Sequence, residues 1–118
     1  MSHAAPAGLP VLDVDPYDEA LLRAPWDYYE ALRAAGPVVW IPRYGVCASG
    51  AIGVVEPVFR DWRRFCSSRG VGLADFAREP PWRPPSLVLE VDPPAHTRTR
   101  EVLARALSPK AVQALTPR

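Results

Sequence analysis

The chain has 118 residues, of which 48% are hydrophobic and 23% charged, a composition typical of one modest globular domain. Its 14 basic and 13 acidic side chains nearly balance, which argues against a surface for nucleic acid or for an anionic membrane. No stretch approaches the roughly 18 apolar residues of a membrane span, and the N-terminus lacks the basic start and apolar core of a secretory signal.

Two cysteines, Cys47 and Cys66, are too few and too unpatterned for a disulfide scaffold or a zinc site. We therefore expect a reduced, cytoplasmic protein in which both cysteines are small buried residues and neither binds a metal. The 15 prolines are concentrated in REPPWRPPS and DPP. Because each proline removes a backbone donor and restricts φ, they predict an irregular loop in the middle of the chain.

An N-terminal arm and then two helices are expected at the start of the chain. Residues 1–16 are rich in Ala and Pro and are expected to form an extended arm, which precedes a domain over residues 17–118. The stretch YDEALLRAPWDYYEALRAAG predicts a short helical turn and then a longer helix. Pro25 suits its first turn, Arg33 lies near its negative end, and Gly36 is a suitable stop.

A hairpin followed by a helix is expected next. Residues 38–41 and 46–48 are rich in β-forming side chains, and residues 43–45 between them suit a turn. A short helix is expected near residues 54–62. Pro57 is compatible with that helix only if it lies in the first turn.

The strongest helix signal lies in the second half of the chain. At most one helical turn is expected around residues 73–77, before the proline-rich loop and an apolar run over residues 87–91. Asp92 is then expected to cap a helix whose first two positions are prolines. This helix should run to about Leu107, just before the dipeptide SP.

One side of this last helix carries two groups that bind anions. His96, Arg100, Leu103 and Leu107 follow one another at steps of four, three and four residues, which places them on one stripe. Arg and His both donate to carboxylates or phosphates, and the positive end of the helix adds to the attraction. The spacing alone also fits a solvated face on which His96 only caps the turn.

The stretch DPPAHTRTREVLARALSP resembles the helix that bacterial cytochrome P450 monooxygenases place against the haem. Phe65 with Ser67 and Ser68, and the preceding helix–hairpin–helix order, extend the resemblance over roughly residues 14–118. In that family the His and the Arg one turn later bind the haem propionates, which implies this role for His96 and Arg100. The implied fold class is α+β, mostly α: helix, short β-hairpin, helix, Pro-rich loop and helix.

A finer resemblance lies in REPPWRPPSLVLEVDPP, which is similar to a loop of P450 enzymes that oxidise para-substituted benzoic acids. In those relatives an arginine and a serine help to hold the substrate carboxylate, and the aliphatic residues that follow touch the ring. The matching residues are Arg83, Ser86, Val88 and Leu89. The alternative is that Arg83 is a surface arginine and Ser86 a turn residue.

The resemblance also implies parts that the 118 residues lack. They contain no Phe-x-x-Gly-x-Arg/His-x-Cys-x-Gly segment for the haem-ligating cysteine, no acid–alcohol pair for oxygen activation and no Glu-x-x-Arg motif. We therefore expect the N-terminal segment of a monooxygenase acting on a small aromatic acid, with electrons delivered by a ferredoxin in the complete enzyme. By itself the segment is expected to be loosely folded and inactive.

Two other interpretations of the same residues remain open. The chain would be a small helical module that binds an anion or a partner through the basic stripe, or a non-functional truncated remnant. A binding module would be stably folded, and its affinity would fall with salt and with loss of Arg100.

Overall fold

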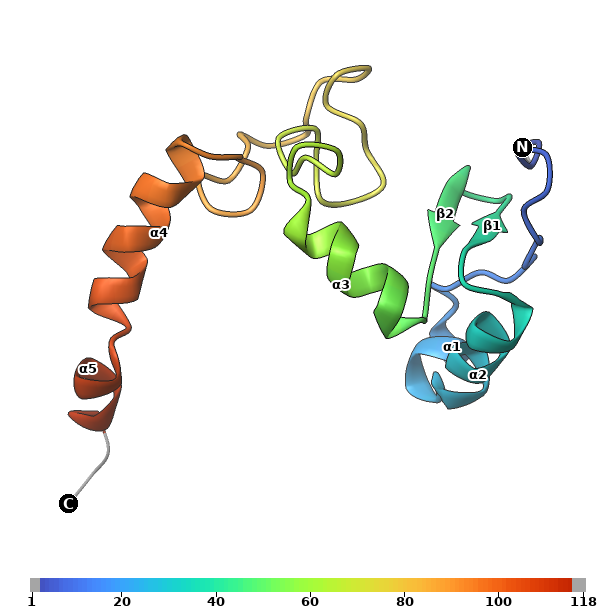
Figure 1. The fold of residues 1–118 in the computed structure, drawn as a ribbon, viewed down its shortest axis with the longest axis horizontal. Helices are drawn as coiled ribbons and strands as arrows, with labels where there is room; N and C mark the ends of the chain where they lie inside the picture. Colours follow the sequence, from blue (N-terminus) through green and yellow to red (C-terminus); the bar gives the residue numbers. More distant parts are fainter. Residues whose placement is uncertain (1–2, 116–118) are drawn as a thin grey trace. The chain divides into compact units, whose positions relative to one another are not determined.

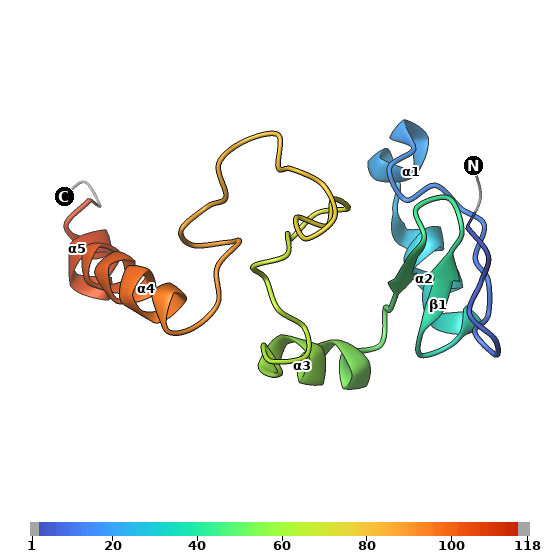
Figure 2. The ribbon, with the colours of Figure 1, turned by 90° about the horizontal axis from the view of Figure 1, so that it is seen from above.

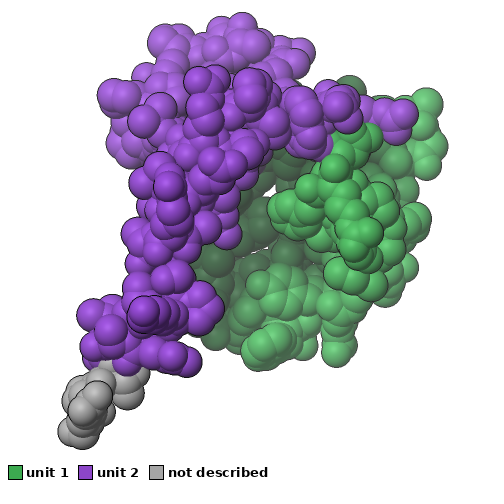
Figure 3. Space-filling model, turned by 60° about the vertical axis from the view of Figure 1, so that its left-hand side comes forward, with its two compact units in different colours: residues 1–61 green, residues 62–118 purple. Residues whose placement is uncertain are grey.

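A computed structural model describes residues 3–115, and the chain divides into two compact units, Met1–Asp61 and Trp62–Arg118 (Figure 3). The first unit contains three helices and a two-stranded sheet: α1 (Glu19–Arg23), α2 (Trp26–Ala35), β1 (Val39–Ile41), β2 (Val46–Ala48) and α3 (Ile52–Arg60) (Figure 1). The second contains a long loop, α4 (Ala95–Ala106) and α5 (Pro109–Gln113). The chain is thus helix-rich with one small antiparallel sheet.

Local signals set the ends of α1 and α2. The carboxylate of Asp18 accepts hydrogen bonds from the backbone N–H groups of Ala20 and Leu21, at 2.9 and 3.2 Å, and so caps α1. Pro25 occupies the N-cap of α2, one residue before the first turn in which it was expected. Gly36 ends α2 with a φ of 146°, in the region that favours glycine.

The core of the first unit forms where α2 packs on the hairpin. Leu32, Val39 and Ile41 are buried, and six half-buried residues pack around them: Leu12, Tyr28, Ala35, Tyr44, Val46 and Ala48. β1 and β2 pair antiparallel, with Ile41 opposite Val46. Because side chains alternate along a strand, Val39 and Ile41 share the buried face.

The same alternation overturns one expectation for the cysteines. Cys47 pairs with Trp40, lies between the two half-buried residues of β2 and is exposed, not buried. Cys66 is half-buried in the loop of the second unit. Residue size and polarity suggested burial for both, but the register of the hairpin decides the face on which Cys47 lies.

The segment before α1 runs along the hairpin (Figure 2). Val11 forms a parallel bridge with Trp40, whose N–H donates to the Pro10 carbonyl at 2.8 Å and whose carbonyl accepts from Leu12 at 3.0 Å. Further along, Asp15 accepts from the Tyr44 hydroxyl at 2.7 Å. Extended residues 10–12 therefore satisfy backbone groups that an edge strand would leave open.

α3 differs from its expected position. It begins at Ile52 and ends at Arg60, so that Pro57 lies in the helix interior instead of the first turn. Pro57 has no N–H, so the helical hydrogen bond from this position to the carbonyl of Gly53 cannot form. The helix starts early because the N–H groups of Val54 and Val55 both donate to the Ala51 carbonyl, at 2.9 and 3.0 Å.

Within the second unit, the turn expected around residues 73–77 starts at Asp75. The Asp75 carbonyl accepts from the N–H groups of Arg78 and Glu79, at 2.8 and 3.0 Å, and its carboxylate accepts from the Ala77 N–H at 3.0 Å. Arg69 pairs with the same carboxylate. Side-chain capping by Asp75 therefore sets the start of the turn, and no α-helix forms there.

Asp92 does not cap α4 with its side chain, contrary to the sequence prediction. The helix begins at Ala95, after the cis Pro93–Pro94 peptide, and its N-cap is Pro94. The Asp92 carboxylate instead accepts from the N–H groups of Ser67 and Ser68 at 2.9 and 3.0 Å. Only its backbone carbonyl serves the helix, by accepting from the His96 N–H at 3.1 Å.

Candidate functional site

His96 and Arg100 lie one turn apart on α4, at the spacing that puts them on one face. His96 is half-buried and Arg100 exposed. Within the described part of the chain, the Arg100 guanidinium forms no ion pair, and neither side chain makes a hydrogen bond.

The lower part of the same stripe is aliphatic. Leu103 is half-buried, and Leu107, the C-cap residue of α4, is 67% exposed. The stripe therefore carries polar donors near the start of the helix and apolar groups near its end.

Asp92 connects the start of α4 to the preceding loop. Hydrogen bonds from the side chain of Ser68 and the backbone of Ser67, and more weakly the charge of His96, hold the pKa of Asp92 below its ordinary value of 3.8. The carboxylate is therefore ionised at neutral pH. Asp92 lies four residues before His96, and its carboxylate holds the backbone of Ser67 and Ser68 close to the start of the helix.

Arg83 and Glu90 form a two-point ion pair in the loop before α4. Arg83 Nη1 donates to Glu90 Oε2 at 2.8 Å, and Arg83 Nη2 donates to Glu90 Oε1 at 2.6 Å. The Glu90 side chain is 3% exposed, whereas that of Arg83 is 35% exposed. Arg83 and the backbone N–H of Ser86 lower the pKa of Glu90 from 4.5, despite the opposing effect of burial.

Ser86 shapes the backbone between these two charges. Its Oγ accepts from the N–H groups of Val88 and Leu89, both at 3.2 Å, and its own N–H donates to Glu90 Oε2 at 2.7 Å. Val88 is half-buried, and Leu89 is 56% exposed. Of the four expected substrate residues, the loop thus groups Ser86, Val88 and Leu89 in one turn.

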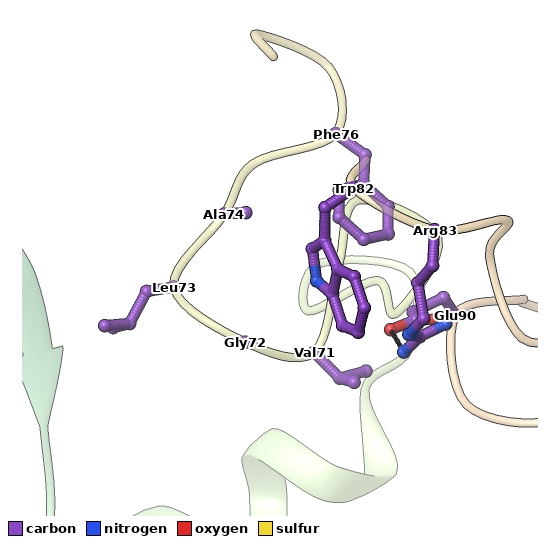
Figure 4. Close-up of a pocket in the computed structure, with 8 residues that line it drawn as sticks. All are labelled: Val71, Gly72, Leu73, Ala74, Phe76, Trp82, Arg83 and Glu90. Carbon is purple, nitrogen blue, oxygen red and sulfur yellow. Dashed lines mark hydrogen bonds and ion pairs between the residues drawn. The ribbon is translucent and has the colours of Figure 1, made fainter. Parts of the chain in front are cut away.

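A cavity of about 320 Å³ opens next to the Arg83–Glu90 pair (Figure 4). Its lining is mostly apolar: Val71, Gly72, Leu73, Ala74, Phe76 and Trp82, with Arg83 and Glu90 as the charged members. Figure 4 shows the Trp82 and Arg83 side chains next to each other, and the Arg83 guanidinium lies 5.4 Å from the Trp82 ring centre. Arg83 is the one expected substrate residue that lines the cavity.

Glu90 is a site residue that sequence reasoning missed. It is an acidic residue within the apolar run LVLEV, and such a residue is rarely buried unless it is paired. That signal was present in the sequence, but the partner, seven residues earlier, was not identifiable from it.

Metal ligands and membrane spans give no further site. Among residues 3–115, no group of three or more His, Cys, Asp and Glu side chains is placed to hold a metal ion. Of the helices described, none combines the length and the apolar character needed to cross a bilayer.

The chain is similar to several bacterial proteins. It is 50% identical over 109 residues, 92% of its length, to cytochrome P450 CYP199A2 of Rhodopseudomonas palustris, of which it covers 26%. It is 32% identical over 105 residues, 89% of its length, to the beta-dihydromenaquinone-9 omega-hydroxylase of Mycobacterium tuberculosis, of which it covers 20%. With cytochrome P450 monooxygenase PikC of Streptomyces venezuelae it shares 32% identity over 123 aligned positions, which cover 95% of this chain and 27% of that protein.

The chain matches only part of each relative. It spans between a fifth and about a quarter of the length of the curated relatives that it matches. No protein-family model matches the chain.

Proposed function

Since the chain belongs to the bacterial cytochromes P450, we propose that it is the N-terminal segment of a haem-dependent monooxygenase acting on a small aromatic acid. Residues 17–118 are the part of the catalytic domain that precedes the oxygen-activating helix and the cysteine ligand. The 50% identity to cytochrome P450 CYP199A2 over 92% of the chain carries this proposal.

The donor set on α4 fits the acidic substituents of haem. His96 and Arg100 are one turn apart and without hydrogen-bond partners in the described residues, and together they offer an imidazole donor and a guanidinium to two propionates. When bound, haem supplies the iron centre at which oxygen is activated. The role of this chain is to bind the propionates and so to orient the group.

Neither cysteine is the iron ligand in this proposal. Cys47 is exposed on β2, and Cys66 lies in a loop, and neither has the flanking phenylalanine and glycines of a haem-ligating segment. The 118 residues by themselves are therefore inactive. Electrons would reach the complete enzyme from a ferredoxin-type donor.

The loop before α4 is the proposed wall for the substrate. Arg83 would pair with the carboxylate of a para-substituted benzoic acid, and Ser86 would donate its hydroxyl hydrogen, which no acceptor among residues 3–115 takes. Val88 and Leu89, which follow Ser86 in the same turn but do not line the cavity beside Arg83, are the aliphatic residues proposed to contact the ring in the complete enzyme. Charge-assisted hydrogen bonds are what a carboxylate requires when it enters an apolar cavity.

Exchange of Arg100 tests the haem assignment. We expect Arg100→Gln, made in the product of the complete reading frame, to speed haem loss to a protein acceptor about tenfold or more, because a charge-assisted hydrogen bond is lost. His96→Gln should act in the same direction. Haem loss is followed by the change in absorbance of the acceptor.

Arg98→Gln is the matched control, because Arg98 is exposed on the same helix but lies off the stripe. Equal haem loss from the Arg98 and Arg100 variants would contradict the assignment. The 118-residue chain mixed with haemin should show no thiolate-type absorbance after reduction and addition of carbon monoxide. Such a signal would show that Cys47 or Cys66 ligates iron.

A further inference from the structure

Three of the five N–H groups of the Arg83 guanidinium are already used. Nη1 donates to Glu90 Oε2 at 2.8 Å and to the Pro84 carbonyl at 3.1 Å, and Nη2 donates to Glu90 Oε1 at 2.6 Å. Among residues 3–115, no acceptor takes the Nε–H or the second Nη2–H. These two hydrogens lie on the same edge of the planar group, and a carboxylate accepts from two parallel N–H groups of one edge.

Glu90 is held more firmly than Arg83. Its carboxylate accepts from both Nη atoms and, at 2.7 Å, from the Ser86 N–H, and its side chain is almost entirely buried. The pKa of Glu90 is lowered by these donors, so that the carboxylate is charged at neutral pH. Arg83 is the more exposed partner, with 35% of its side chain exposed.

The surroundings of Arg83 suit an aromatic acid. The cavity that it lines has a volume of about 320 Å³, within the range of small-molecule sites, and Val71, Phe76 and Trp82 give it apolar walls. The Trp82 ring lies 5.4 Å from the guanidinium carbon of Arg83. A cation–π contact at this distance helps to hold the guanidinium beside the indole ring.

We propose that Glu90 is a positioning residue: it holds the Nη1–Nη2 edge of Arg83 and thereby presents the Nε–Nη2 edge to the carboxylate of the ligand. The ligand binds while the Arg83–Glu90 pair stays intact. This inference rests on the proposed function, because it takes Arg83 as the residue that binds the substrate carboxylate.

The test compares an acid with its neutral amide. In the product of the complete reading frame, binding of 4-methylbenzoate and of 4-methylbenzamide is measured by equilibrium dialysis. We expect Glu90→Gln to lower the preference for the acid about tenfold, while affinity for the amide is unchanged. The glutamine side chain has one acceptor oxygen and one NH2 donor, so it can accept from only one of the two Nη groups. Arg83 then loses the two-point contact that fixes its orientation.

Whether the preference for the acid falls or rises in Glu90→Gln distinguishes a positioning role of Glu90 from a purely electrostatic one. Removal of a negative charge beside Arg83 would by itself strengthen the binding of an anion. A preference for the acid that rises or stays the same in Glu90→Gln therefore overturns the inference. Equal loss of affinity for the acid and the amide also overturns it, because Glu90 would then only support the fold.

Two further variants separate this inference from the proposed function. Glu79→Gln removes the same charge from an exposed position in the same loop and should leave both affinities unchanged. Arg83→Gln should abolish the preference for the acid. If the unaltered protein shows no such preference, the proposed substrate site fails; if Arg83→Gln abolishes it and Glu90→Gln does not, only the role of Glu90 fails.

A direct measurement on the unaltered protein serves if the Glu90 variant does not fold. The Arg83 Nε–H resonance of the arginine-labelled protein should shift on addition of 4-methylbenzoate, while the Nη1 resonance, paired with Glu90 and the Pro84 carbonyl, keeps its position. A shift of the Nη1 resonance without one at Nε would show that the ligand displaces Glu90, and would overturn the inference.

Discussion

Ile41 and Ile52 place the same side chain in opposite environments within the first unit. Ile41 is 1% exposed and packs in the core, whereas Ile52, the first residue of α3, is 76% exposed. A buried methylene contributes to stability both by its transfer from water and by filling space.

We therefore expect Ile41→Val to lower the free energy of unfolding by about 1 kcal/mol. Ile52→Val should change it by less than about 0.5 kcal/mol. Urea unfolding of the product of the complete reading frame, followed by tryptophan fluorescence, measures both. Equal losses in the two variants would show that the core does not lie around Leu32, Val39 and Ile41.

Asp92 gives a prediction for pH. Its pKa is lowered by Ser68, Ser67 and His96, so the contribution of its ionised form is complete above the ordinary value of 3.8. That contribution is lost as the pH falls through the lower value of the folded state. Acid should therefore loosen the contact between Asp92 and residues 67–68.

In the product of the complete reading frame, Asp92→Asn should make the free energy of unfolding fall less between about pH 5 and about pH 2, as measured by urea unfolding across that range. Asp13→Asn is the control, because Asp13 is exposed and has no hydrogen bond or ion pair among the described residues. An unchanged acid dependence in the Asp92 variant would mean that its contacts with Ser67 and Ser68 do not stabilise the fold.

At the scale of the element, α3 contains a proline in its interior, where it interrupts the helical hydrogen bonds. Pro57 is the sixth residue of a nine-residue helix, and its ring leaves the Gly53 carbonyl without its helical donor. Pro57→Ala restores the N–H and should stabilise α3 by about 2 kcal/mol, less than the full helix penalty because the unfolded chain also gains freedom.

Slower hydrogen exchange of the α3 amides in the Pro57 variant would show this gain. Pro109→Ala is the matched control, because Pro109 opens α5, where a missing N–H costs no helical bond. Faster exchange in the Pro57→Ala variant would mean that the fixed φ of proline, and not the missing bond, dominates at this position.

At the scale of the whole molecule, more large hydrophobic side chains are exposed than buried among the described residues. Among the described residues, three hydrophobic side chains are buried and eighteen large ones are exposed, including Trp82 at 85% and Phe59 at 83%. So much exposed apolar surface is typical of faces that pack against further protein or a cofactor. This agrees with relatives of which the chain covers only 26% and 20%.

We expect the isolated 118 residues to unfold over a broad range of temperature, because so small a core gives little cooperativity. Calorimetry measures this as a van't Hoff enthalpy that differs from the calorimetric one. A single sharp transition with equal enthalpies, together with well-dispersed amide resonances, would contradict the expectation.

The local features of this protein were predictable because they depend on neighbours in sequence. Gly36 ends α2, the turn at residues 43–45 connects the two strands, and the spacing of His96 and Arg100 places them on one side of α4. Helical and strand periodicity act over four residues or fewer, so composition and spacing suffice to read them.

Only the tertiary structure decided the partners of the charged loop residues. Asp92 appeared to be a helix cap but binds Ser67, 25 residues earlier, and Glu90 pairs with Arg83 around a turn that has no periodicity. Cys47 is exposed because of the hairpin register. Burial and ion pairing depend on which segments the irregular loops bring together, and a proline-rich loop has no repeating pattern from which that could be read.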